Sequence, residues 1–367
     1  MMSLPFERVA VEPGTESSPI YRNLRKTLPQ LPFTSVAEVA PTAAETSRSG
    51  DAFGAAKRTL YLTRHKGDFF KKCPGSEGQV CCNYFVINFA SNCPMDCSYC
   101  YLQEYLADNA ALKVFSNVDD LIQEADHTLA RHRGVFFRIG TGEITDSLAL
   151  EPYTGMVGEL IPYFAAQPNV LLELKTKSDC VESLLDLDPN GRVVVAWSMN
   201  PQPVIDRDEH GTASLAARLA AARRCQDAGY RLGFHFDPIM EYPGWEPDYE
   251  SMLEQTFATI DWRKLSWVSL GVLRQTPALK RTMRARFPDS RLLTGEQVLC
   301  PDGKWRYFQP LRVEIYRKMV RWIRRAAPTV KIYLCMESRE VWEQVFGFAP
   351  TCEKELGNQM APAVPFI

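Results

Sequence analysis

The sequence predicts an α/β fold built on a partial, TIM-like barrel of six parallel strand–helix units. Short runs rich in β-branched and aromatic residues alternate with longer stretches of helical periodicity, and this alternation is typical of a parallel sheet with crossover helices. The 367 residues are 46% hydrophobic and 23% charged. That composition supports a substantial core and excludes disordered and fibrous classes of protein.

Six segments are predicted as the strands of this sheet: 84–89, 135–140, 170–176, 192–198, 231–237 and 267–273. Stretches between them, such as 120–132 and 214–230, have the pattern of helices. Six units indicate an incomplete barrel, although a doubly wound sheet remains open as an alternative. In either architecture the functional side chains gather at the C-terminal ends of the strands.

Three regions are expected along the chain. Residues 1–56, with many Pro, Ser, Thr and Glu, are predicted as a partly irregular N-terminal arm, with order beginning near Thr59. Residues 57–275 form the barrel, and residues 276–367 form a C-terminal region with a β-hairpin and helices. The N-terminal residues lack the apolar run of a signal peptide or membrane anchor, so we expect a cytoplasmic protein that does not contact membranes.

Charge is distributed unevenly. Residues 261–331 contain 17 Lys or Arg and 5 Asp or Glu, a balance of +12, whereas the rest of the chain (25 basic, 39 acidic) carries −14. Such a segment suits a polyanion such as DNA, although a solvated basic helix face is an equally ordinary explanation.

The most specific motif is the sequence CPMDCSYC, which places Cys93, Cys97 and Cys100 just after the first strand of the barrel. A structural zinc site takes four ligands, and a cubane iron–sulfur cluster normally takes four thiolates. In a cluster of four irons, three thiolates leave one iron without a protein ligand. In a reducing compartment, the eleven cysteines of the chain are better explained as metal ligands, redox groups or buried hydrophobes than as disulfides.

A CxxxCxxC motif with an aromatic residue before the third cysteine resembles the radical S-adenosylmethionine (radical SAM) superfamily. This resemblance implies a 4Fe-4S cluster whose open iron chelates SAM, and cleavage of SAM to a 5'-deoxyadenosyl radical. It also implies a reductase such as flavodoxin or ferredoxin as a partner.

Longer segments resemble one family within that superfamily, the spore photoproduct lyases, which revert a methylene-bridged thymine dimer in DNA. The resemblance implies a DNA repair lyase that binds lesion-containing DNA, with Tyr99 and Tyr101 supporting the return of a hydrogen atom. Packing beside the cluster would explain both tyrosines equally well. The segments that carry the resemblance are AKRTLYLTRHKGDFF, CSYCYLQ, KTKSDCVESLLD, SMNPQPVI and HGTASLAARLAAARRCQDAGYRLGFHFDPI.

The same resemblance implies cofactor contacts at the ends of two later strands. Lys177 matches a family lysine near the SAM carboxylate, a role that suits its charge, although a lysine at a strand end can simply reach solvent. Ser198 and Asn200 match family positions near the ribose, although Ser and Asn after a strand also form turns.

The chain departs from the family after the second strand. Its members have a cysteine there that returns a hydrogen atom to the product, whereas this chain reads FFRIGTGEITDS. Gly142 and Glu143 instead resemble the GGE element that receives the SAM ammonium in other radical SAM enzymes, and Asp146 is an alternative to Glu143. A solvent-exposed loop acid is the competing explanation for Glu143.

Because no cysteine occurs between Cys100 and Cys180, the hydrogen donor must come from elsewhere. The candidates are Tyr99, Tyr101, bound 5'-deoxyadenosine and another cysteine such as Cys335, which follows a predicted strand. A free cysteine at a strand end is more often a buried small residue.

Substrate contacts are expected at the mouth of the barrel and along the basic segment. Alternation places His235 and Asp237 on the same face of their strand, where an inward pair would meet the substrate and a core histidine is the alternative. The hairpin with the PDG turn interleaves cations and aromatic rings, which suits phosphate contact and base stacking or packing on the body. The proposed DNA contacts are Arg274, Lys304, Arg306 and Tyr307, and the cluster Lys280, Arg281, Arg284 and Arg286 would extend the phosphate track.

The leading prediction is therefore a spore photoproduct lyase-like enzyme. A radical SAM enzyme of the same fold acting on another nucleic acid or a peptide is the alternative, because the donor cysteine is absent. A non-catalytic metal-bound module is the third hypothesis.

Overall fold

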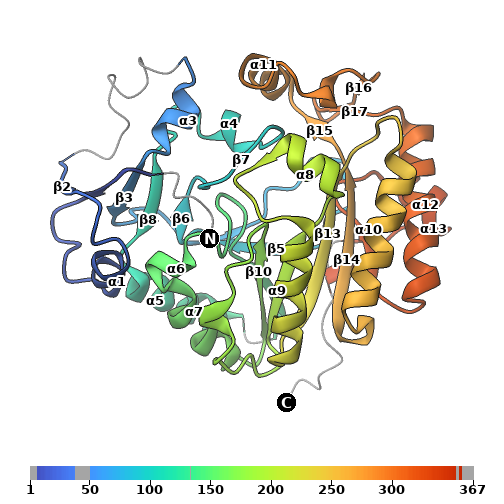
Figure 1. Ribbon diagram of the computed structural model, residues 1–367. Helices are drawn as coiled ribbons and strands as arrows, with labels where there is room; N and C mark the ends of the chain where they lie inside the picture. The colour runs from blue at the N-terminus through green and yellow to red at the C-terminus, as the bar shows by residue number, and fades with distance from the viewer. Residues whose placement is uncertain (1–5, 38–49, 133, 353–354, 358–367) are drawn as a thin grey trace.

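The computed structural model describes residues 6–37, 50–132, 134–352 and 355–357 (Figure 1). Its main element is an eight-stranded sheet in the order β18-β14-β13-β11-β10-β9-β5-β4. All six predicted strands form and run parallel in chain order, which confirms a mixed α/β fold. The bounds are β4 Phe70–Lys72, β5 Tyr84–Ile87, β9 Phe137–Gly140, β10 Val170–Thr176, β11 Val193–Ser198, β13 Arg231–Ile239, β14 Leu265–Val272 and β18 Ile332–Leu334.

The sheet continues beyond the six predicted strands at both edges. β18 adds to β14 in parallel, and β4 adds to β5 in antiparallel orientation. Both additions are three residues long. A six-unit barrel therefore describes the centre of the sheet and not its edges.

The sheet curls strongly. Four strands separate β9 from β18, so in a flat sheet they would lie about 24 Å apart. Instead, Arg138 Nη2 on β9 donates to the hydroxyl of Tyr333 on β18 at 2.8 Å. A bridge between Val80 and Glu337 also joins the two edges. The concave side is therefore an enclosed interior, and we call its end at the C-terminal ends of the strands the mouth of the barrel.

Helices cover the convex side of this sheet (Figure 1). Each buries one face; in α12, for example, Val313, Tyr316 and Ile323 are buried at helical spacing, while Arg317 and Arg321 face solvent. Side-chain caps fix several helix starts, as where Ser214 accepts from the amide of Ala217. The larger helices are α5 Val118–Arg131, α7 Met156–Ala165, α8 Gln202–Asp208, α9 Leu215–Asp227, α10 Trp245–Thr259, α12 Gln309–Ala326 and α13 Arg339–Phe346.

The expectation that order begins near Thr59 is wrong. Residues from Phe6 onward build a second sheet in the order β2-β1-β3-β8-β6, and Val9 and Leu24 are completely buried. Its elements are β1 Arg8–Val11, α1 Pro19–Thr27, β2 Phe33–Ser35, α3 Ala52–Ala56, β3 Thr59–Thr63, β6 Ala90–Ser91 and β8 Leu112–Phe115. Residues 38–49, within the Ala-, Ser- and Thr-rich stretch, lie outside the described residues. The three regional boundaries remain a prediction.

The expected C-terminal hairpin is present. β16 Val298–Leu299 and β17 Trp305–Arg306 pair in antiparallel orientation, and β15 Arg274–Gln275 adds a third strand. Gly303 has a φ of 77° at the turn, where a residue with a side chain would be strained. Helix α11, Pro277–Arg286, connects β15 to this hairpin. Among the described residues, no helix combines the length and apolar character needed to cross a bilayer.

Candidate active site

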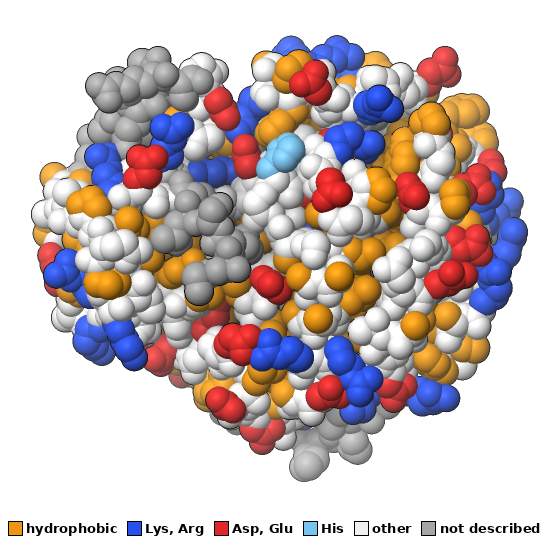
Figure 2. Space-filling model, in the orientation of Figure 1, with side chains coloured by type: hydrophobic (Ala, Val, Ile, Leu, Met, Phe, Trp, Pro, Cys, Tyr) orange, Lys and Arg blue, Asp and Glu red, His pale blue; other side chains and the backbone are white. Residues whose placement is uncertain are grey.

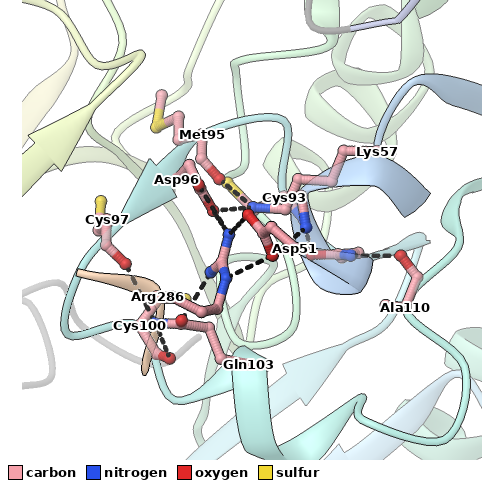
Figure 3. Close-up of polar contacts among 12 residues, drawn as sticks. Asp51, Lys57, Cys93, Met95, Asp96, Cys97, Cys100, Gln103, Ala110 and Arg286 are labelled. Carbon is pink, nitrogen blue, oxygen red and sulfur yellow. Dashed lines mark hydrogen bonds and ion pairs between the residues drawn. The ribbon is translucent and has the colours of Figure 1, made fainter. Parts of the chain in front are cut away.

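The loop with the three cysteines lies between β6 and helix α4, Leu102–Tyr105, beside the C-terminal end of β5 (Figures 1 and 3). Asn92 fixes the start of this loop in a left-handed conformation with φ of 66°. Its side chain accepts from the amide of Cys93 at 2.8 Å and donates to the carbonyl of Ala110 at 2.6 Å. The amide of Cys100 donates to the carbonyl of Cys97 at 3.1 Å. The backbone thus holds the three cysteines in one tight loop.

The three thiols lie within electrostatic range of one another. Burial raises the pKa of Cys93 to about 12 and raises the pKa values of Cys97 and Cys100. The positive charges of Lys57 and Lys177 partly oppose these shifts. Metal coordination deprotonates such thiols, and two neighbouring cations would offset the negative charge of the thiolates.

Within the ranges that the structure describes, no three Cys, His, Asp or Glu side chains converge closely enough to hold a metal ion. The donor set nevertheless fits the implied cluster, because Cys93 and Cys100 pack against a small apolar group of Phe53, Leu102 and Ala110, and Cys97 is also buried.

Arg286 clamps this loop from outside (Figure 3). Its guanidinium donates twice to Asp51 at 2.7 Å, to Gln103 at 2.6 Å and to Asp96 at 2.9 Å. Lys57 adds a 2.9 Å ion pair to Asp96. The Arg286 side chain is only 8% exposed. It is therefore a structural clamp, and its predicted place in a phosphate track is corrected.

Glu209 is the centre of a buried network directly behind the cysteines. It lies in the two-residue strand β12, Glu209–His210, opposite Cys97 of β7, Asp96–Cys97. Its carboxylate accepts from the hydroxyl of Tyr99 and from Arg218 Nη2 at 2.5 Å, with Lys177 Nζ at 3.9 Å. Burial alone would raise the pKa of Glu209, but the two cations outweigh it and lower that pKa to about 2. Tyr99 is thus held by an ionised carboxylate.

Ser198 and Asn200 lie at the C-terminal end of β11, on the same edge as Lys177 at the end of β10. The Asn200 amide donates to Glu209 at 2.8 Å and its oxygen accepts from Tyr249 at 2.7 Å. These bonds engage both ends of the Asn200 amide, so its main visible role is to orient Glu209. The ribose contacts remain a prediction.

The GTGE segment lies tightly against β10. A Cβ on Gly142 would stand 2.9 Å from the carbonyl oxygen of Lys175, so only glycine fits without movement. The hydroxyl of Tyr101 donates to the carbonyl of Glu143 at 2.6 Å. Burial raises the pKa of Glu143, while Lys175 opposes the shift. Tyr101 thereby connects the cysteine loop to the candidate SAM-binding segment.

Asp146, the alternative to Glu143, is already engaged. It accepts from the amides of Leu148 and Ala149 at 2.9 Å, from the hydroxyl of Thr176 at 2.7 Å and from the amide of Lys177 at 2.7 Å. These four bonds tie the loop after β9 to the end of β10. Asp146 is thus an organiser of the site, which argues against a direct cofactor role.

His235 points into the barrel, where it donates from Nε2 to Glu173 at 2.5 Å. Arg138 pairs with the same carboxylate at 3.3 Å. Burial lowers the pKa of His235, the Glu173 carboxylate opposes this shift, and the charges of Lys175 and Arg138 add to it. His235 is 7% exposed and paired, as the core-histidine alternative expects, and its contact with the substrate stays a prediction.

Asp237, two residues along the same strand, reaches the mouth and binds Arg274 through two bonds of 2.8 and 2.9 Å. Arg274 Nη2 also lies 3.9 Å from the sulfur of Cys335. Burial and the charge of Asp237 raise the pKa of Cys335 to about 12. The Arg274 charge is thus largely neutralised within the protein.

Cys73 is the residue that sequence reasoning missed. It follows the edge strand β4, and its amide donates to the carbonyl of Tyr84 at 2.8 Å. Burial and the nearby charge of Glu143 raise the pKa of Cys73 to about 11, and electrostatic contacts also connect it with Tyr101 and Cys335. Cys73 therefore lies among the candidate catalytic groups. Its only sequence signal is a thiol shortly before the first barrel strand.

Two of the four predicted DNA contacts turn inward. Arg306 is 1% exposed and forms a bidentate pair with Asp302 at 2.5 and 2.7 Å. Tyr307 is 2% exposed and its hydroxyl accepts from the amide of Glu241 at 3.0 Å. Because neither side chain is accessible, their assignment as DNA contacts is corrected, and both instead support the hairpin.

Several other residues on and beside the hairpin are half-buried or exposed. Lys304 Nζ donates to the hydroxyl of Ser76, across the mouth of the barrel. Lys280 lies 4.5 Å over the ring of Trp305. The ring of Phe308 is 61% exposed. A cation and an exposed aromatic ring thus remain on this side of the mouth.

Comparisons with known proteins agree on one family. The family model described as spore photoproduct lyase matches residues 9–331. Among curated proteins, the spore photoproduct lyase of Geobacillus sp. (strain Y412MC61) is 30% identical over 210 residues, 57% of this chain and 62% of the relative. That of Bacillus subtilis (strain 168) is 30% identical over 215 residues, 58% of this chain and 63% of the relative. The match therefore spans less than two thirds of each of these two relatives.

Solved structures extend the likeness over more of the chain. A spore photoproduct lyase double mutant with bound AdoMet and dinucleoside spore photoproduct matches 90% of this chain and 99% of its own, at 26% identity and a TM-score of 0.80. A second structure, spore photoproduct lyase complexed with dinucleoside spore photoproduct, matches 90% and 98% with the same identity and TM-score.

Proposed function

This chain belongs to the spore photoproduct lyase family, and we propose that it is a radical SAM lyase that reverts the spore photoproduct in DNA to two thymines. The observation that carries the proposal is its likeness, over 90% of the chain, to a structure that holds both AdoMet and a dinucleoside spore photoproduct. The cysteine loop beside the C-terminal end of a barrel strand, where such folds bind their ligands, supports it.

Cys93, Cys97 and Cys100 would hold the cluster, and their enclosure and neighbouring cations suit its charge. When bound, a 4Fe-4S cluster and SAM supply a 5'-deoxyadenosyl radical that takes a hydrogen atom from the lesion. Lys177, with its ammonium group beside the loop, suits the SAM carboxylate. Glu143 suits the SAM ammonium group.

The DNA lesion would bind at the mouth of the barrel. Lys304 offers a cation for a phosphate, and the exposed ring of Phe308 offers a surface on which a base can stack. A lesion is cheaper to extrude from a duplex than a paired base. The Arg274–Asp237 pair and His235 would then line the floor and wall of the pocket.

Cys73 is the proposed hydrogen donor. After the methylene bridge breaks, one thymine carries an unpaired electron and needs one hydrogen atom. Because the pKa of Cys73 is raised to about 11, this side chain keeps its S–H bond at neutral pH. Transfer of that hydrogen gives thymine and a Cys73 thiyl radical, which regains a hydrogen atom through Tyr101 or 5'-deoxyadenosine. Cys335 lies farther along the same mouth and is the second candidate.

The decisive experiment is anaerobic repair by the full chain with reconstituted cluster, dithionite, SAM and a lesion-containing oligonucleotide. We expect restored thymine and 5'-deoxyadenosine. Run in D₂O, the restored thymine should carry one solvent-derived deuterium, because thiol hydrogens exchange with solvent and the carbon-bound hydrogens of 5'-deoxyadenosine do not.

Three cysteine variants then identify the donor. Cys73→Ala should still form 5'-deoxyadenosine but lose most of the thymine yield, whereas Cys225→Ala, buried in α9 away from the mouth, should retain it. Full repair by Cys73→Ala together with its loss in Cys335→Ala would transfer the donor role to Cys335. If wild type formed 5'-deoxyadenosine and left the lesion intact, the substrate assignment would be wrong.

The alternative, a different substrate for the same radical chemistry, was based mainly on the absent cysteine. The position of Cys73 among Glu143, Tyr101 and Cys335 weakens that reason. Lesion turnover decides between the two.

A further inference from the structure

Three exposed arginines of the basic segment lack acidic partners among the described residues and lie on or just beyond α11. Arg281 and Arg284 on α11, and Arg291 just beyond it, are exposed, and none of them pairs with an acid among the described residues. By contrast, Arg274 and Arg286 are bound to aspartates. Figure 2 shows Lys and Arg side chains over α11 at the top of the molecule. Uncompensated positive charge at one place indicates an external anionic partner.

This basic surface adjoins the outer side of the cysteine loop. Arg286, at the end of α11, binds Asp96, the neighbour of Cys97 in β7. The next residue, Phe287, stacks on the ring of His210, with centroids 5.5 Å apart and planes at 23°. His210 in turn pairs with Asp96 between the strands β12 and β7. An aromatic pair therefore covers the strand that bears Cys97.

The inner side of the same loop faces the proposed cofactor and substrate. Tyr101 reaches the carbonyl of Glu143, and Lys177 lies beside Glu209 on the barrel side. SAM and the lesion would fill that side. An electron carrier would then have to approach from the outer side, because electron transfer weakens steeply with distance.

We propose that the outer face, defined by His210, Arg281, Arg284, Phe287 and Arg291, is the docking surface for an acidic electron-carrier protein of the flavodoxin or ferredoxin type. This inference rests on the proposed function, since it requires a cluster in the loop. Charge complementarity mainly raises the rate of encounter. Weak redox complexes need only a small interface, below about 1,200 Å².

DNA is the competing partner for these arginines. The accessible groups suited to DNA, Lys304 and Phe308, lie at the hairpin and the mouth, whereas the contacts of Arg286 and Phe287 place the end of α11 over β7 and β12. A donor docked there would stand directly over the cysteine loop. The position of the aromatic pair therefore favours the electron carrier.

The test compares Arg281→Glu with Arg284→Glu in one chain against a matched control, Arg131→Glu with Arg321→Glu. The control residues are exposed, lie on α5 and α12, and form no salt bridge among the described residues, so the net charge changes equally. For each full-length protein, three quantities are measured: 5'-deoxyadenosine formation driven by reduced flavodoxin, the same reaction driven by dithionite, and the affinity for flavodoxin without SAM at low and high salt.

We expect the α11 variant to lose about tenfold in flavodoxin-driven rate and in flavodoxin affinity at low salt, with the difference shrinking at high salt. Its dithionite-driven rate should match that of the control. Equal flavodoxin affinity and rate in the two variants would overturn the docking surface. Weaker lesion-DNA binding with unchanged flavodoxin affinity would assign the arginines to DNA and also overturn it. If wild type formed no 5'-deoxyadenosine even with dithionite, the proposed function itself would fail.

Discussion

Replacing Arg286 with alanine removes a side chain that ties α11 to both flanks of the cysteine loop (Figure 3). Its guanidinium binds Asp51, which caps the N-terminus of α3, and Asp96, the neighbour of Cys97. We expect the substitution to lower stability and the retention of iron together, because the same contacts hold the fold and the loop.

The size of the effect follows from the surroundings of the three charged groups. Removing one partner of a fully buried ion pair costs about 3–5 kcal/mol. Arg286 is 8% exposed, but Asp51 and Asp96 are 40% and 32% exposed, so water can solvate them after the change. Asp96 also keeps Lys57. We therefore expect a loss of about 2–3 kcal/mol in the free energy of unfolding, or about 3–4 °C in melting temperature for a chain of this length.

The assay is thermal unfolding at a fixed scan rate, paired with iron content after reconstitution. Arg284→Ala, an exposed neighbour on the same helix, should change stability by less than about 0.5 kcal/mol. Arg286→Lys keeps the positive charge but not the planar guanidinium group, so its loss of stability should lie between those of the two alanine variants. If Arg286→Ala and Arg284→Ala had equal melting temperatures and equal iron content, the clamp would be refuted. Weaker DNA binding without a stability change would instead restore the phosphate-track assignment.

Three further predictions follow from the same contacts. The folded-state pKa of Glu209 is lowered to about 2, so the ionised carboxylate should contribute its full stabilisation above about pH 4.5, and this stabilisation should disappear as the pH falls toward 2. The melting temperature of Glu209→Gln should therefore depend less on pH in that range than that of the wild type. Identical pH profiles for the two proteins would contradict the prediction. Lys304→Ala should reduce the salt dependence of DNA binding by about the slope of one phosphate contact. Arg306→Ala should leave that slope unchanged but lower the melting temperature, because the substitution leaves the buried carboxylate of Asp302 unpaired. A Cβ on Gly140 would lie 1.5 Å from a tyrosine hydroxyl oxygen, so Gly140→Ala should destabilise by about 1–3 kcal/mol, while Gly158→Ala, in an open position of α7, should be neutral or stabilising.

The six central strands could be predicted because each is a short run rich in β-branched and aromatic residues, which burial in a parallel sheet favours. The edge strands could not. β4 reads FKK, with two exposed lysines, and β18 contributes only three residues. The N-terminal sheet was missed for a related reason: β1 is four residues long in a Pro- and Ser-rich context, and its stability comes from pairing with β3, 48 residues or more away along the chain.

The same distinction between local and distant signals applies to the site. The three cysteines could be predicted because eight contiguous residues contain them. Glu209 and Arg218 are ordinary charged residues in the sequence, and their importance comes from burial in one network with Tyr99. Cys73 needed the pairing of β4 with β5 to bring it to the candidate catalytic groups.

The net charge of a sequence segment does not give the charge that its residues present on the protein surface. The balance of +12 in residues 261–331 suggested one continuous basic field. In the structure, acids from other parts of the chain neutralise much of it: Asp237 binds Arg274, Asp51 and Asp96 bind Arg286, Glu337 binds Arg312 and Glu250 binds Arg325. The arginines left without an acidic partner among the described residues include Arg281 and Arg284 on α11, Arg291 just beyond it, and Arg321 on α12. A binding surface is defined by charges without partners, and of these arginines the ones on α11 lie beside the cysteine loop, where the proposed electron carrier would dock.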